Sequence, residues 1–195
     1  MSAAREITIE LNGSPTTIDA QPHESLRTVL RRAGMMSVKF GSDTGETGAG
    51  AVLMDGRLVS SDVIYAMQAD GHAVTTVESL NVGPELHPIQ AAFVATGAFQ
   101  SGYSAGAMVL GTLALLERDP DPSDEAIRDM LSGILDRETG YVKPVEAVRR
   151  AAAALRGDRT EPFAPVVLPP MTDGRNPVEV APDDPPPAHS YAVPR

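Results

Sequence analysis

The spacing of apolar residues changes once along this chain of 195 residues, close to residue 88. Before that point, short runs such as residues 5–11 alternate apolar with polar side chains, and Asn-Gly or Asp-Gly pairs separate neighbouring runs, which is typical of β-hairpins. After it, apolar residues recur every three or four positions as far as residue 156, which is typical of amphipathic helices. The pattern therefore predicts an α+β protein with its strands first and its helices second.

The first eighty residues predict two hairpins, one short helix and a final strand. The helix is expected between Ser25 and Gly34, where apolar residues share one face. The stretch 41–50 carries four glycines and no large apolar side chain. This composition predicts a loop with unusual backbone angles that encloses another chemical group. The strands are expected at residues 5–11, 16–18, 51–54, 57–59 and 74–77.

The helical part predicts four helices with clear breaks between them. The first is expected to begin near Pro88 and the second to cover Met108–Leu116. The third follows the N-cap Ser123 and extends to Leu135, and the fourth has Pro144 at its first helical position. Four helices of this kind indicate a small all-α bundle.

These patterns divide the chain into residues 1–82, residues 83–156 and residues 157–195. The last segment contains ten of the 17 prolines and has no periodic apolar pattern, so it cannot form a core of its own. We expect it to be extended chain that is either mobile or laid along a partner surface. Its plausible anchors are Phe163, Val166, Val167 and Leu168.

Charge and composition exclude several classes of function. The chain has 26 acidic and 16 basic residues and a net charge of −10, which argues against nucleic-acid binding. It has no cysteine, which removes disulfides, thiolate catalysis and thiolate-held metal sites. The sequence has neither a signal-peptide pattern at its start nor a membrane-spanning segment, so we expect a cytoplasmic protein.

One segment, KFGSDTGETGAGAVLMDGRLVSSD, resembles the plant-type [2Fe–2S] loop of the small subunit of molybdenum hydroxylases, the group of xanthine dehydrogenase, aldehyde oxidoreductase and CO dehydrogenase. The family pattern is C-x4-C-x2-C, with a fourth cysteine after eleven further residues. This chain keeps the spacing but has other residues at the four places, namely Ser42, Thr47, Gly50 and Asp62.

Two segments of the helical part, GAFQSGYSAGAMVL and LSGILDRETGYVKPVEAV, resemble the second cluster-binding region of the same family. The family pairs cysteines with two residues between them in the first segment and one residue between them in the second. The residues at these places are Ser101, Ser104, Asp136 and Glu138.

The resemblance implies a β-grasp, ferredoxin-like domain followed by a four-helix bundle. It also implies that the partner is a large molybdopterin-binding subunit, with a flavin or another redox subunit further along the electron path. In the family the region of Gln100 faces the pterin, so Gln100 is a candidate contact to the partner's cofactor.

The vacated positions cannot hold a cluster by the family's chemistry. A [2Fe–2S] cluster needs four strong anionic donors, hydroxyl groups are too weakly acidic to replace them, and Gly50 has no side chain. We therefore expect this chain to bind no cofactor or metal, with molybdopterin in its partner. Carboxylates and hydroxyls are expected instead to accept the loop N–H groups. A less favoured alternative is an oxygen-ligand metal site at Asp43, Glu46 and Asp62.

These observations predict a cluster-free, non-electron-transferring structural subunit that is not catalytic by itself. A second hypothesis is a transient assembly or regulatory module for the large subunit. A third, less favoured, is an enzyme that uses Asp62, Asp136 and Glu138 as a new metal site.

Overall fold

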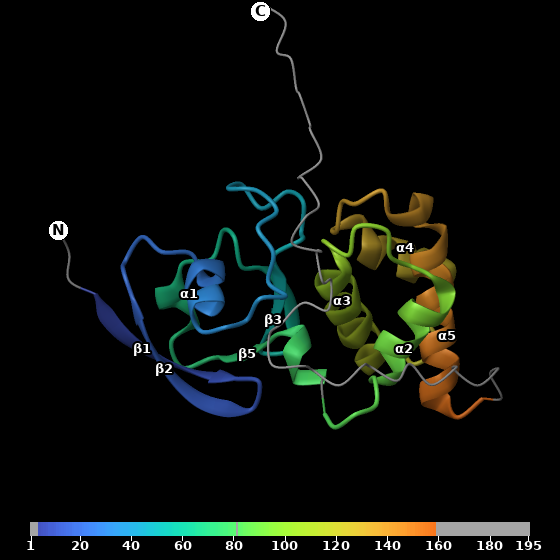
Figure 1. The fold of residues 1–195 in the computed structure, drawn as a ribbon, viewed down its shortest axis with the longest axis horizontal. Helices are drawn as coiled ribbons and strands as arrows, with labels where there is room; N and C mark the ends of the chain where they lie inside the picture. The colour runs from blue at the N-terminus through green and yellow to red at the C-terminus, as the bar shows by residue number, and fades with distance from the viewer. Residues whose placement is uncertain (1–3, 81, 159–195) are drawn as a thin grey trace, which may run out of the picture.

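The computed structural model describes residues 4–80 and 82–158. A five-stranded mixed sheet occupies one side of the molecule and four α-helices the other (Figure 1), which confirms the α+β expectation. The strands are β1 (Arg5–Leu11), β2 (Ser14–Ala20), β3 (Ala51–Met54), β4 (Arg57–Ser60) and β5 (Ala73–Thr75). The α-helices are α1 (Leu26–Arg32) on the sheet, then α2 (Pro88–Thr96), α3 (Ala105–Arg118), α4 (Asp124–Ser132) and α5 (Val142–Arg156). We call residues 4–80 the sheet half and residues 82–158 the helical half.

The sheet has the order β2-β1-β5-β3-β4. Two antiparallel hairpins, β1–β2 and β3–β4, are joined by β5, which runs parallel to β1 and antiparallel to β3. The alternation of residues 5–11 sets the register, because Ile7, Ile9 and Leu11 all face the core and are buried. The hairpin predictions are therefore confirmed.

Helix α1 covers the sheet because three of its seven residues are apolar and buried. Leu26, Val29 and Leu30 are all fully buried, and Ser25 Oγ caps the first turn by accepting the Thr28 N–H at 3.3 Å. Short 3-10 helices follow the strands: η1 (Ala66–Ala69), η2 (Val77–Leu80) and, in the helical half, η3 (Glu138–Tyr141).

Several element boundaries differ from the sequence prediction, and three of the differences concern residues that the prediction placed inside or at the start of an element. The last strand ends at Thr75, and Val77 begins η2. Helix α4 ends at Ser132, so Leu135 lies outside it and is 55% exposed. Pro144 is the third residue of α5, where its missing N–H costs nothing because the first four N–H groups of a helix have no partner inside it.

The apolar core of the helical half reaches the sheet half. It is built from α2, α3, α4 and α5 and includes Ala51 of β3, with Leu58 of β4 packed against it. In the described part of the chain, no helix is long and apolar enough to cross a membrane. The tail predictions, including Phe163, Val166, Val167 and Leu168, fall outside the described residues.

Candidate functional site

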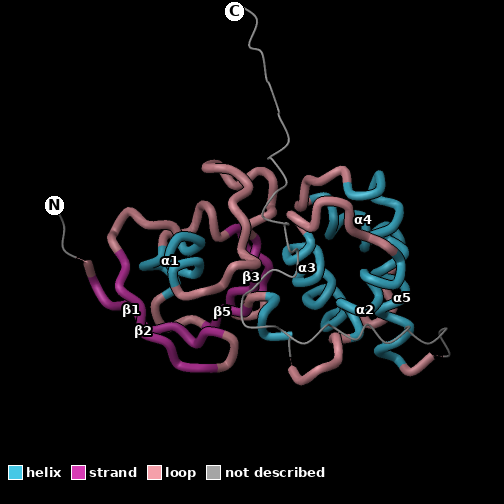
Figure 2. Tube along the Cα trace, viewed as in Figure 1, coloured by secondary structure: helices cyan, strands magenta, loops and turns pink. Residues whose placement is uncertain are grey.

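The candidate site consists of two groups of loops, one from each half, that meet along one edge of the molecule (Figure 2). The first group is residues 41–50 with Asp62, and the second is residues 99–104 with residues 133–139. Both contain the positions at which the sequence predicted vacated ligands.

Residues 41–50 close on themselves through their own side chains, and hydroxyl groups accept loop N–H groups as expected. The Ser42 hydroxyl accepts the Gly45 N–H at 2.8 Å and donates to the Glu46 carboxylate at 2.8 Å. Thr47 Oγ1 accepts the Ala49 N–H at 3.4 Å. The loop thus obtains from hydroxyl groups some of the acceptors that its backbone requires.

Asp62 is a buried carboxylate beneath this loop. Its side chain is 1% exposed, and its Oδ1 lies 2.8 Å from Nε of Arg27 on α1. The two atoms form an ion pair, although their orientation does not satisfy hydrogen-bond geometry. Burial raises the pKa of Asp62, and the guanidinium of Arg27 only partly opposes this effect. Arg27 also lies over the Phe40 ring, 4.4 Å from its centroid.

The space beside Gly50 is already occupied by Asp62. A Cβ atom at position 50 would lie 2.3 Å from Asp62 Oδ2 and 2.9 Å from the carbonyl oxygen of Lys39. A side chain at position 50 therefore cannot coexist with this arrangement of Asp62. At position 50, protein atoms already fill the space that a ligand side chain would need.

Glu138 fills the second group in the same way. Its side chain is inside the protein, with the residue 1% exposed. Its carboxylate accepts the Ser101 N–H at 3.0 Å, the Gly102 N–H at 3.1 Å and the Ser101 hydroxyl at 2.8 Å, together with the Gln100 N–H. Burial by itself raises the pKa of Glu138, but these hydrogen bonds outweigh it, so the pKa lies below its usual value.

Asp136 binds the remaining hydroxyl of this group. Its Oδ2 accepts the Ser104 hydroxyl at 2.9 Å and lies 3.4 Å from the Ser101 hydroxyl. Ser101 has only one proton to donate, and Glu138 is the closer acceptor. The structure therefore brings together all four predicted positions of the second group.

Gln100 is exposed on the same loop and is tied to η3. Its side-chain oxygen accepts the Thr139 N–H at 2.7 Å. Thr139 and Tyr141 both have left-handed backbone angles, with φ values of 49° and 62°, so this hydrogen bond holds an unfavourable turn.

The two groups of loops are in direct contact. The Leu135 N–H donates to the Thr47 carbonyl oxygen at 2.8 Å, and the Tyr103 hydroxyl donates to the Phe40 carbonyl oxygen. Gly48 approaches the helical half so closely that a Cβ atom there would lie 2.0 Å from the Gly133 carbonyl oxygen. The sequence did not reveal the parts played by Arg27, Tyr103 and Gly48, because no motif distinguishes an arginine on a helix or a tyrosine in a loop from a surface residue.

The alternative of an oxygen-ligand metal site finds no geometric support. Within residues 4–80 and 82–158, no three His, Asp or Glu side chains are grouped so that they could hold one ion. Asp62 faces Arg27, while Glu46 accepts hydrogen bonds from Ser42 and Thr44. The same finding removes support from a three-carboxylate enzyme site.

Comparison with known proteins identifies the relatives of this arrangement. Residues 76–149 match the family model described as a [2Fe-2S] binding domain. One of the nicotinate dehydrogenase subunits of Pseudomonas putida is 40% identical over 77% of this chain and 96% of its own length. The small FeS subunit of nicotinate dehydrogenase from Eubacterium barkeri is 39% identical over 74% of this chain and 93% of its own length.

Solved structures share the fold as well. Quinoline 2-oxidoreductase from Pseudomonas putida contains a chain that matches with a TM-score of 0.75 and 32% identity, over 81% of this chain and all of that one. The aldehyde oxidoreductase of Desulfovibrio desulfuricans matches with a TM-score of 0.76 and 35% identity, over 80% of this chain and 18% of the enzyme.

These relatives contradict the expectation of no cofactor. The family is a [2Fe–2S]-binding one, and its members are named FeS or iron-sulfur-binding subunits, so the cofactor class that the family implies is a [2Fe–2S] cluster. The prediction gave the missing ligands more weight than the cluster that the family implies.

The residues present do not fit a cluster held by thiolates. No cysteine occurs in the sequence, Asp62 fills the space beside Gly50, and Glu138 already accepts the loop N–H groups that surround the second ligand set. The relatives and the fold nevertheless show that the chain belongs to the family of small iron–sulfur subunits of molybdenum hydroxylases, in a form without cysteine.

Proposed function

We propose that this chain is a structural subunit that docks on a large molybdopterin-binding subunit without itself transferring electrons. In this proposal residues 1–82 act as a β-grasp domain and residues 83–156 as a four-helix bundle. Support comes from relatives that are named subunits and that the chain matches over most of its length. The chain by itself has no catalytic role in this proposal.

The observation that carries the proposal is the hydrogen bonding of Glu138. In iron–sulfur proteins, N–H groups around a cluster donate to its sulfur atoms. Here the N–H groups of Gln100, Ser101 and Gly102 donate to one buried carboxylate instead. A buried anion with this many donors keeps the loop in a defined shape, since each donor is satisfied only while the loop encloses Glu138.

The side chains at the two sets of former ligand positions cannot transfer electrons. Carboxylates, hydroxyls and a guanidinium have no accessible second oxidation state, so electrons cannot pass through Glu138, Asp136 or the Arg27–Asp62 pair. In this proposal a substrate-oxidising complex that contains this chain sends its electrons out by another route, such as a further redox subunit.

Gln100 is the residue that we propose for contact with the partner's pterin. It is exposed on the loop that Glu138 holds, and its bond to the Thr139 N–H fixes the orientation of its amide. We expect Gln100→Ala to lower turnover of the complex while the two chains still co-purify. Equal turnover of the variant and wild-type complexes would mean that Gln100 does not contact the pterin.

The test is co-expression with the large subunit followed by size exclusion and electron paramagnetic resonance after reduction with dithionite. We expect a stable one-to-one complex and no spin-1/2 signal of a reduced [2Fe–2S] centre in this chain. A signal that integrates to one or more spins per chain would refute a non-conducting role. A complex that dissociates on the column would favour the transient assembly or regulatory module.

Glu138→Ala supplies the matched variant for docking. We expect it to lose most of the one-to-one complex, because the loop of residues 99–104 loses its acceptor. Glu117→Ala, an exposed position on α3, removes the same charge without touching that loop and is expected to retain the complex.

A further inference from the structure

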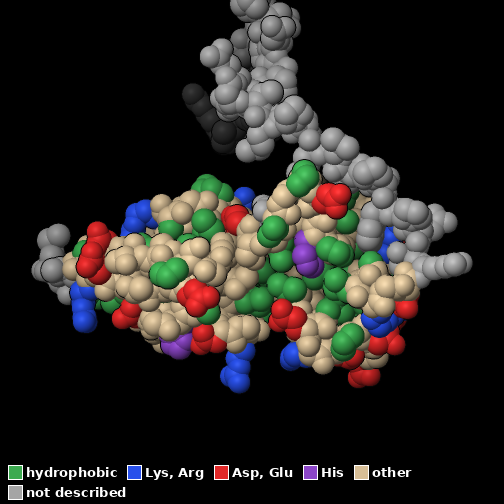
Figure 3. Space-filling view, turned by 90° about the horizontal axis from the view of Figure 1, so that it is seen from below, with side chains coloured by type: hydrophobic (Ala, Val, Ile, Leu, Met, Phe, Trp, Pro, Cys, Tyr) green, Lys and Arg blue, Asp and Glu red, His purple; other side chains and the backbone are tan. Residues whose placement is uncertain are grey.

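An apolar groove lies between the two halves and borders the second group of loops at Phe99 and Gly102. It has a volume of about 310 Å³, near the lower limit of about 300 Å³ for pockets that hold ligands. Apolar side chains gather along this junction when the molecule is viewed from below (Figure 3). The residues that carry its apolar surface are Val77, Leu86, Val94, Phe99 and Val109.

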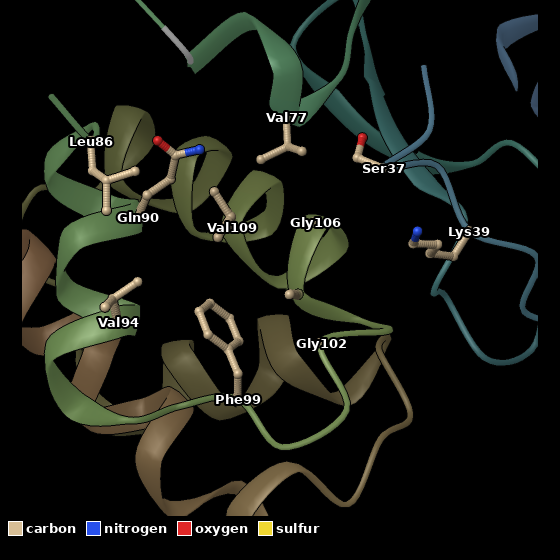
Figure 4. A pocket seen from close by; sticks show the side chains of 11 residues that line it. Ser37, Lys39, Val77, Leu86, Gln90, Val94, Phe99, Gly102, Gly106 and Val109 are labelled. Carbon is tan, nitrogen blue, oxygen red and sulfur yellow. The ribbon is translucent and has the colours of Figure 1, made fainter. Parts of the chain in front are cut away.

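The side chains of the groove come from both halves. Figure 4 shows Leu86, Val94 and Phe99 around the space on the helical side, with Ser37 and Lys39 on the sheet side. Val94 is 41% exposed although it stands on a helix whose opposite face is buried against α5. Continuous apolar surface of this kind is normally covered by another segment or by a partner.

We propose that the groove is the docking site for this chain's own residues 162–170. That segment reads Pro-Phe-Ala-Pro-Val-Val-Leu-Pro-Pro and holds the tail's densest run of apolar side chains. Prolines at its ends and at position 165 favour the extended polyproline II conformation, which docks into apolar grooves at a low cost in chain entropy. This inference goes beyond the proposed function and does not depend on it.

The chain leaves the helical half at a suitable place. Helix α5 ends at Arg156, and the last turn of α5 and the first turn of α2 lie at the same end of the helical half (Figure 1). Leu86 and Gln90, at that end of α2, line the groove. Ten residues of extended chain span roughly 33 Å, about three times the 10 Å width of a helix, so residue 168 can pass α2 and enter the groove.

Charge is compatible with this occupant. Among the described residues that line the groove, Lys39 is the only charged one. Residues 162–170 contain no charged side chain, so their burial in the groove would leave no charge of the tail without a partner.

The absence of cysteine permits a direct test in the full-length chain. A pair of introduced cysteines, Val94→Cys in the groove and Leu168→Cys in the tail, is oxidised under limiting oxidant and followed by non-reducing electrophoresis and mass spectrometry. The matched control pairs Leu168→Cys with Val142→Cys. Val142 is 63% exposed at the opposite end of α5 and nearer to residue 168 in sequence.

We expect the groove pair to form its intramolecular disulfide at least tenfold faster than the control pair. Rates within twofold of each other would overturn the proposal. A nitroxide attached to the single variant Val94→Cys gives a second measurement, and it should broaden the amide signals of residues 163–168 but not those of residues 185–190. Tail signals that are not broadened would overturn the proposal. A groove variant that no longer binds the large subunit, while the tail signals stay unchanged, would also overturn it and would assign the groove to that partner.

Discussion

Glu138 is the side chain on which the second group of loops depends most. Glu138→Ala leaves the N–H groups of Ser101 and Gly102 without their acceptor inside the protein, so we expect it to lower the free energy of unfolding by about 2–4 kcal/mol. Glu138→Gln keeps the shape and one acceptor oxygen and should cost less than half as much. Urea unfolding measures both, with Glu117→Ala as the exposed control. Equal stability of Glu138→Ala and Glu117→Ala would contradict this role.

Asp62 and Glu138 should respond to pH in opposite directions. The pKa of Glu138 is lowered by folding, so its contribution is present above the ordinary glutamate pKa of about 4.3 and is lost as the pH falls through the folded value. The pKa of Asp62 is raised by burial, so stability falls as the pH rises from about 3.9 through its folded value.

Urea unfolding of Asp62→Asn and Glu138→Gln between pH 3 and pH 8 tests both signs. Relative to wild type, Asp62→Asn should gain stability as the pH rises from about 3.9. Glu138→Gln should lose stability relative to wild type as the pH rises toward about 4.3 and should show a constant difference above that pH. A constant difference over the whole pH range for either variant would mean that folding does not shift that carboxyl group's pKa.

The sequence predicted the positions of the candidate site better than its contacts. The resemblance to the family placed Ser101, Ser104, Asp136 and Glu138 together, and hydrogen bonds join them in the structure. It could not predict Arg27, because an ion pair between α1 and Asp62 depends on how the sheet half folds rather than on any local motif. The cofactor expectation was wrong, because the missing ligands were given more weight than the cluster that the family implies.

Among the elements, the loop of residues 41–50 is the one whose packing against the helical half can be tested cleanly. Gly48 has a φ of 67°, and a Cβ atom there would collide with the Gly133 carbonyl oxygen. Gly56 in the β3–β4 turn has a φ of 75° and open space around it. An alanine would adopt a strained backbone at either position, but only at position 48 would its Cβ also collide with another atom.

We expect Gly56→Ala to cost about 1–2 kcal/mol from the left-handed backbone alone. Gly48→Ala adds a clash with backbone and should cost about 1–3 kcal/mol more. Thermal unfolding of the two variants measures the difference. Equal costs would mean that the two halves are not in close contact at this point.

Helix and strand types followed from periodicity, whereas their ends did not. The alternation of buried residues in β1 and the N-cap Ser25 of α1 could be predicted, because both depend only on neighbouring residues in the sequence. Leu135 was assigned to α4 by its apolar spacing, but the chain turns away after Ser132 so that the Leu135 N–H can reach the Thr47 carbonyl oxygen. A contact between halves thus overrides the local pattern.

For the molecule as a whole, the α+β organisation and the family were both accessible from the sequence, because the spacing of eight positions survives without their cysteines. What fills those positions is a property of the folded chain. In the helical half a buried carboxylate accepts several N–H groups of one loop, and in the sheet half the hydroxyls of Ser42 and Thr47 accept N–H groups of the other, so neither loop uses thiolate ligands.

The most direct measurement of this central claim is an NMR titration of the Glu138 carboxyl carbon, together with the amide signals of residues 100–102. We predict that Glu138 titrates below the usual glutamate range and that these amides are sharp and protected from exchange, because they donate to its carboxylate. Titration at or above the usual range, rapid exchange, or loss of these signals to paramagnetic broadening by a nearby iron centre would contradict it.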